Sequence, residues 1–149
     1  MSKTYYDIAL NEYQYLRYNL GINSLYNNPN AVLCQQVIEK MFKYILSELE
    51  PDACELRFNN LMKVNIALKR NNVDLQCNDL ELAYLTDFYF DARYPGDDYI
   101  DVSDEGLQKC VDIMEDIKYR VESYLKYRKE EKFDNSSIID KAIKSMFTG

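Results

Sequence analysis

The residues best suited to chemistry lie close together in one short segment. It reads Arg93-Tyr94-Pro95-Gly96-Asp97-Asp98-Tyr99. A guanidinium can bind a phosphate or stabilise developing negative charge, whereas a carboxylate accepts hydrogen bonds, binds cations or takes up a proton. Arg93 therefore has two possible roles: it binds a phosphate, such as that of a nucleotide, or it pairs with nearby carboxylates at the C-terminal end of a helix. We favour pairing, for which the candidate partners are Asp87, Asp91, Asp97 and Asp98.

The same segment lacks the ligand pattern of a metal site. Asp97, Asp98 and Asp101 do not have the regular spacing of an EF-hand loop, so they are predicted to form a solvated acidic turn. The four cysteines include no Cys-x-x-Cys pair, and the chain has no histidine to complete a zinc site. Three of these cysteines fall in apolar helical patterns and are predicted to pack in the core. The sequence predicts neither a metal nor a cofactor.

Charge is distributed unevenly along the chain. The formal net charge is −7, yet the stretch from Asp74 to Asp116 contains thirteen acids and only two basic residues, Arg93 and Lys109. Affinity for nucleic acid comes largely from Lys and Arg side chains that neutralise phosphates, so this stretch repels a phosphate backbone. Non-specific binding of DNA or RNA is therefore not expected.

The elements that position this segment are predicted to be helices. Only four glycines and three prolines occur in 149 residues, which leaves long uninterrupted stretches. Asn78 and Ser103 are suited to cap the fourth and fifth helices. The sequence therefore predicts an all-α fold, an antiparallel bundle of about five helices plus a short C-terminal helix. Apolar residues recur every three or four positions, the spacing of one helix face, in Tyr6–Leu20, Ala31–Leu49, Leu61–Leu68, Leu82–Ala92, Leu107–Arg128 and Ser136–Phe147.

We expect one domain, in which residues 1–132 form the bundle and residues 133–149 add the C-terminal helix. The polar run from Arg128 to Asp134 separates this last helix from the bundle, which makes it the segment best placed to dock on a neighbouring chain. Met1–Asp7 lacks the apolar region of a secretory signal, and no apolar run approaches the roughly 20 residues of a membrane span. A cytoplasmic protein that is not associated with a membrane is expected.

Three stretches, taken in order, resemble the HEPN family of small helical domains. Cys34-Gln35-Gln36-Val37-Ile38-Glu39-Lys40-Met41-Phe42-Lys43 is similar to the family pattern A-Q-Q-A-x-E-K-x-x-K. Asn59-Asn60-Leu61 stands where relatives often have His-Asx-Leu. Tyr89 to Asp97 resembles Y-x-x-x-R-Y-P-D and is followed, as in the family, by an acidic turn and a long helix. The resemblance spans about residues 5–127.

The resemblance implies a prokaryotic protein of the toxin–antitoxin type, which forms a homodimer and works with a nucleotidyltransferase partner. Ribonuclease members of the family have a histidine four to six residues after the arginine that Arg93 matches, and this chain has none, so no catalytic residue is predicted. In some members a tyrosine just beyond the arginine motif is adenylylated, and Tyr99 lies one position out of that register. The candidate residues for binding a ligand or phosphate are Arg93, Tyr94, Asp97, Asp98 and Tyr99.

Two functions from different classes follow. One is a non-catalytic interaction module; the other is a toxin that binds nucleotides or cleaves RNA, using Arg93 with carboxylates in place of histidine. The acidic surroundings of Arg93 favour the first. The polar residues of the second stripe, Gln35, Gln36, Glu39 and Lys43, are predicted to form a solvated helix side with one i,i+4 ion pair.

Overall fold

The computed structural model describes residues 2–22 and 26–148, apart from the side chains of 132–140, 147 and 148. The described residues contain helices and no strand. The predicted all-α fold is confirmed. The elements are α1 (Tyr5–Gly21), α2 (Asn27–Leu49), the short 3₁₀ helix η1 (Cys54–Arg57), α3 (Leu61–Arg70), α4 (Asp79–Asp91) and α5 (Asp104–Thr148).

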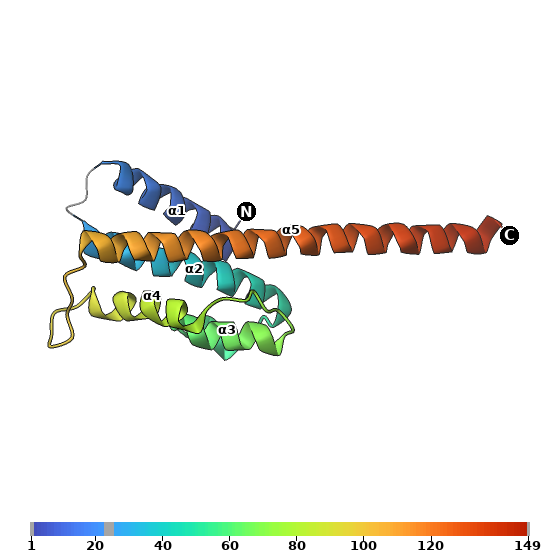
Figure 1. Cartoon of the computed structure of the whole chain (residues 1–149). Coiled ribbons are helices and arrows are strands. Elements are labelled where there is room, and N and C mark those ends of the chain that lie inside the picture. Colours follow the sequence, from blue (N-terminus) through green and yellow to red (C-terminus); the bar gives the residue numbers. More distant parts are fainter. Residues whose placement is uncertain (1, 23–25, 149) are drawn as a thin grey trace.

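Helix α2 is the centre of the bundle. It packs against each of the other four α-helices, with α1 on one side of the α2–α5 pair and α3 and α4 on the other (Figure 1). Ile38, Met41, Phe42 and Ile45 on α2 are fully buried. Burying large apolar side chains is the main stabilising contribution to such a bundle, at about 1.5–3 kcal/mol for each side chain.

Local capping explains where several helices begin. The Oγ1 of Thr4 accepts a hydrogen bond from the Asp7 backbone N–H, and the Asp7 carboxylate accepts one from the Thr4 backbone N–H, so α1 starts with a capping box. Asn78 caps α4 with its side-chain oxygen, and the Ser103 Oγ accepts a hydrogen bond from the Gly106 N–H at 3.0 Å at the start of α5. Both caps that the sequence predicts are confirmed.

The predicted break near the C-terminus is wrong. Helix α5 runs without interruption from Asp104 to Thr148, so no separate helix begins at Ser136. The segment between Arg128 and Asn135 contains neither proline nor glycine, and most of its residues are good helix formers, so nothing in it ends the helix. The last part of α5 extends well beyond the bundle as a single helix (Figure 1).

The polar side of α2 is buried. The predicted solvated helix side is therefore wrong. Gln35 is 0 % exposed, Glu39 6 % and Lys43 7 %. The Lys43 Nζ donates to the Glu39 Oε1 at 3.1 Å, so the predicted i,i+4 pair does form, inside the protein. Burial raises the pKa of the Glu39 carboxyl, and the neighbouring Lys43 ammonium opposes that rise.

None of the described helices combines the length and the apolar composition that crossing a membrane would require.

Candidate functional site

The segment that follows α4 is held against the start of α2 by one asparagine. The Asn28 Nδ2 donates to the Ala92 carbonyl at 3.2 Å and to the Ile100 carbonyl at 2.8 Å. The Val102 N–H donates to the Asn28 Oδ1 at 2.8 Å. A single half-buried side chain therefore fixes both ends of the loop between α4 and α5.

Asn27, the neighbouring residue, adds two hydrogen bonds at the start of α5. Its Nδ2 donates to the Val102 carbonyl at 3.0 Å and to the Asp104 Oδ1 at 2.8 Å. Within the loop, the Ile100 N–H donates to the Asp91 carbonyl at 3.0 Å. Gly96 has a φ of +152°, which residues with a side chain rarely adopt, so glycine is needed at this turn.

Arg93 lies on aromatic rings and not on carboxylates. Its guanidinium carbon is 4.3 Å from the centroid of the Tyr89 ring and 5.0 Å from that of the Tyr94 ring. None of the ion pairs between described residues includes Arg93, so the predicted pairing with a nearby aspartate is wrong. The face of a tyrosine ring attracts a cation, and Tyr89, itself buried, presents its ring where α4 ends.

The other predicted site residues surround Arg93 in sequence but are not joined to it in one cluster. Tyr94 contacts the guanidinium, whereas the Tyr99 hydroxyl accepts a hydrogen bond from the Asn28 Nδ2 at 3.1 Å. Asp97 and Asp98 are exposed, as expected of a solvated acidic turn. The site is thus an exposed cation on two tyrosine rings, next to two solvated carboxylates.

The prediction that three of the four cysteines pack in the core is confirmed for two of them. Cys34 and Cys110 are buried in the core, where burial raises the pKa of each thiol, for Cys110 to about 12. Cys77 is half-buried and Cys54 is exposed. Among the described residues, no group of three or more metal-ligating side chains lies close enough together to hold an ion.

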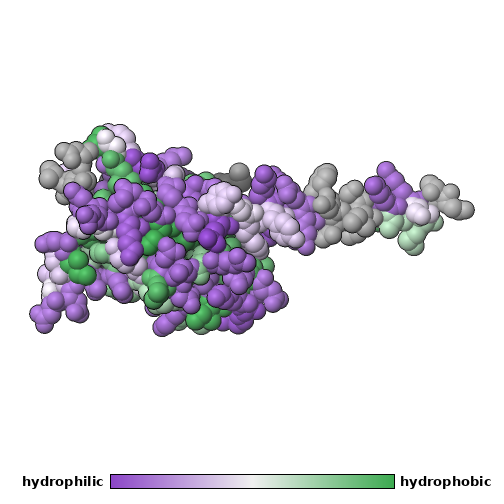
Figure 2. Space-filling view, viewed as in Figure 1, coloured by the Kyte–Doolittle hydropathy of each residue, from purple (hydrophilic) through white to green (hydrophobic). Residues whose placement is uncertain are grey.

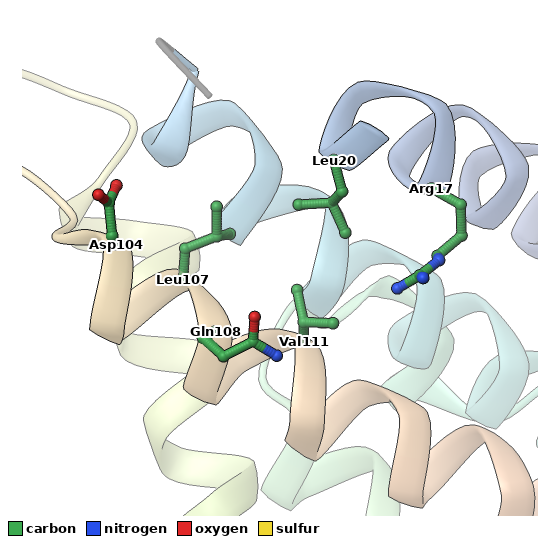
Figure 3. Close-up of a pocket in the computed structure, with 6 residues that line it drawn as sticks. All are labelled: Arg17, Leu20, Asp104, Leu107, Gln108 and Val111. Carbon is green, nitrogen blue, oxygen red and sulfur yellow. The ribbon is translucent and has the colours of Figure 1, made fainter. Parts of the chain in front are cut away.

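A surface hollow that the sequence analysis missed lies between α1 and the first turns of α5. Its volume is about 410 Å³, and Figure 3 shows a guanidinium at one side and a carboxylate at the other. Arg17 and Glu115 come within 3.9 Å of each other, so the guanidinium already faces an acid. No sequence motif predicts this hollow, because its lining residues come from α1 and α5, which are far apart in the sequence. Its lining residues are Arg17, Leu20, Asp104, Leu107, Gln108 and Val111.

A model of one protein family, the HEPN domain, matches residues 2–124, which is most of the chain. The chain belongs to the HEPN family. Searches of curated proteins and of solved structures gave no significant match. The match ends within α5, so the extended end of that helix lies outside the matched residues.

Residues in the stretches that resemble HEPN patterns make hydrogen bonds that stabilise the helical bundle. Gln35, from the second-helix pattern, donates from its Nε2 to the Asn59 carbonyl at 2.9 Å. Asn60, next in the chain, caps α3 by accepting hydrogen bonds from the N–H groups of Met62 and Lys63. The Gln35 hydrogen bond ties α2 to the segment just before α3, whereas the Glu39–Lys43 pair lies within α2. All of these contacts stabilise helices or their packing.

Replacing Arg93 with alanine should have little effect on stability. An exposed cation–π contact contributes about 0.5–1 kcal/mol, which corresponds to a fall in Tm of about 1–4 °C in a domain of this size. Thermal melts at low and high salt measure it. Lys109→Ala is the matched control, because the Lys109 Nζ lies 4.2 Å from the centroid of the Tyr84 ring. A much larger fall for Arg93→Ala that high salt reduces would indicate ion pairing instead.

Proposed function

We propose that this HEPN protein is a non-catalytic interaction module of the prokaryotic cytoplasm. In this proposal it forms a homodimer and works with a partner such as a nucleotidyltransferase in a toxin–antitoxin-type system. The observation that carries the proposal is the surroundings of Arg93. The matching arginine of the HEPN ribonucleases acts with a histidine, and here two exposed carboxylates and a tyrosine follow Arg93 in a chain without histidine.

The chemistry of RNA cleavage explains why the missing histidine argues against a ribonuclease. Attack by the ribose 2′-hydroxyl needs a proton acceptor that titrates near neutrality. A solvated carboxylate ordinarily titrates near pH 4 and a phenol near pH 10. The negative charges of Asp97 and Asp98 would also oppose the approach of a phosphodiester. An interaction role requires neither a base nor a phosphate-binding surface.

Exposed apolar side chains on the bundle support an interaction role. Figure 2 shows apolar groups scattered among polar ones on the visible face. Ile66 is 63 % exposed and Leu80 is 81 % exposed, and both would lose this exposure under a docked chain. Burial of such side chains is a main source of affinity in protein interfaces.

Light scattering over a wide concentration range tests the homodimer. The proposal expects a mass of about 35 kDa, twice the 17.7 kDa of one chain. An isologous interface would use the same patch on both copies, so the mass should not rise further with concentration. A mass of one chain at every concentration would contradict the proposal.

One observation favours a second candidate, a toxin that binds nucleotides at Arg93 or cleaves RNA with it. The guanidinium pairs with no described carboxylate, so its N–H groups can meet a phosphate without first breaking an ion pair. Titration with ATP by calorimetry tests this role against Arg93→Ala and the Lys109→Ala control. Binding that Arg93→Ala abolishes and Lys109→Ala preserves would establish nucleotide binding at Arg93.

A further inference from the structure

A pocket of about 540 Å³ lies between the end of α1 and the start of α2. Helix α1 contributes Tyr15 and Asn19 to its lining, and α2 contributes Asn30 and Leu33. Figure 1 shows these two helix ends at the end of the bundle opposite the projecting part of α5. Pockets that bind small molecules typically have volumes of about 300–1,000 Å³. The pocket is therefore large enough for a small ligand.

None of the described residues that line this pocket is charged. Charged residues make up 29 % of the chain, and the hollow beside α5 is lined by Arg17 and Asp104, so the composition of this pocket is distinctive. A charged ligand would lose part of its hydration here without gaining an opposite charge, which is unfavourable. The pocket therefore favours an uncharged ligand.

Two tyrosine rings of the pocket are available for a ligand. Tyr15 is 59 % exposed on α1, and Tyr26 is 60 % exposed at the N-cap of α2. Neither ring contacts another ring or a cation among the described residues. Aromatic rings attract one another in offset-stacked or edge-to-face arrangements. These two side chains therefore favour a ligand that contains a ring.

The side chain of Asn30 lacks one hydrogen-bond partner. Asn30 is 0 % exposed and lines the pocket, and its Oδ1 accepts a hydrogen bond from the Asn19 Nδ2 at 3.3 Å. Its Nδ2 has no acceptor among the described residues. A buried donor without an acceptor is destabilising, so a ligand oxygen at this position would be stabilised. The ligand that fits this donor has a carbonyl group.

Asn19 controls access to this donor. Its hydrogen bond to Asn30 is longer than the usual 2.9–3.0 Å of an N–H···O bond, and its side chain is only half-buried. Its amide can therefore turn towards solvent at little cost when a ligand enters. A ligand carbonyl can then reach the Asn30 Nδ2, while the ring of the ligand remains near the mouth of the pocket.

We propose that this pocket binds a small uncharged ring compound with a carboxamide or other carbonyl group. The ring packs against Tyr15 and Tyr26, and the carbonyl oxygen accepts a hydrogen bond from the Asn30 Nδ2. This inference goes beyond the proposed function, because it requires neither a second chain nor Arg93. Tyr26 and Pro29 of the pocket flank Asn28 in the sequence, so the ligand binds to the same end of α2 that holds the loop after α4.

The first test is a titration of the full chain with benzamide, followed by NMR of the ligand. We expect binding at millimolar concentrations. Benzoate has the same ring with a carboxylate in place of the carboxamide, and it should bind at least roughly 10-fold more weakly. No binding of benzamide at about 10 mM would overturn the proposal. Benzoate that binds as tightly as benzamide would also overturn it, because a cationic site would then be responsible.

The second test locates the bound benzamide. Tyr15→Ala and Tyr26→Ala should each weaken binding about 5-fold, because each removes one ring contact. Tyr18→Ala is the matched control, since Tyr18 is also an exposed tyrosine of α1, at 66 %, and does not line the pocket. All three side chains are exposed, so the variants should fold, which circular dichroism checks. Unchanged binding in both pocket variants, or an equal loss in Tyr18→Ala, would overturn the site.

The third test concerns the buried amide. Asn30→Leu keeps a side chain of similar size and removes the donor, so it should weaken benzamide binding about 5-fold. Toluene has the ring without the carbonyl, and it should bind this variant at least as tightly as the wild type. Equal affinity of both proteins for benzamide would overturn the role of Asn30. If Asn30→Leu does not fold, the two tyrosine variants decide the proposal.

Discussion

Replacing Lys43 with methionine should lower the free energy of unfolding by about 3–5 kcal/mol, because it leaves the buried Glu39 carboxylate without its partner. Glu39 and Lys43 are 6 % and 7 % exposed and lie 3.1 Å apart, in the middle of the central helix. Urea unfolding at neutral pH measures the loss. The double variant Glu39→Leu/Lys43→Met should recover most of it, because two apolar side chains of similar size then replace the pair.

The loss in Lys43→Met should depend on pH with a definite sign. Burial raises the pKa of Glu39 above its ordinary 4.5, so its contribution is most favourable below that value and is lost as pH rises through the raised pKa. Without Lys43 the largest opposing influence is gone, so the pKa of Glu39 rises further. The stability difference between wild type and Lys43→Met should therefore be smallest near pH 4 and grow towards pH 7. A difference that stays constant over this range would contradict the buried pair.

Replacing Asn28 with alanine should release the loop that follows α4. The change removes four hydrogen bonds, to Ala92, Tyr99, Ile100 and Val102, and leaves the N–H of the buried Val102 without an acceptor. At about 0.5–1 kcal/mol for each bond, the expected loss is about 2–4 kcal/mol. Hydrogen exchange followed by mass spectrometry should show faster exchange in peptides covering residues 92–103 than elsewhere.

Asn78→Ala is the matched control for this experiment. It also removes an asparagine that accepts two backbone hydrogen bonds, but at the start of α4. Its expected cost is about 1 kcal/mol, without selective release of the loop. Unchanged exchange of the loop in Asn28→Ala would show that the loop is positioned by other contacts.

The helices could be predicted because their signals are local. Repeats of three and four depend only on neighbouring residues. The side chains of Asn78 and Ser103 accept hydrogen bonds from backbone N–H groups only two or three positions further along the chain. The ordered stretches from Cys34 to Asp97 likewise predicted the HEPN family that the match confirms.

The remaining features depend on which elements meet in space. Gln35, Glu39 and Lys43 read as a solvated helix side, but they are buried because other helices surround α2. Arg93 has aspartates close in sequence, yet its contacts are with Tyr89 and Tyr94, a choice set by geometry where α4 ends. The expected break after Arg128 relied on polarity alone, which does not end a helix that has no proline or glycine.

The proposed non-catalytic function is best tested by incubating the purified protein with transfer RNA and messenger RNA at neutral pH. The incubation is run with and without magnesium, alongside Arg93→Ala. We expect intact RNA in every reaction, because the segment after Arg93 provides exposed carboxylates and no base that ordinarily titrates near neutrality. Cleavage by the wild-type protein that disappears in Arg93→Ala would contradict the non-catalytic function and establish the RNA-cleaving toxin.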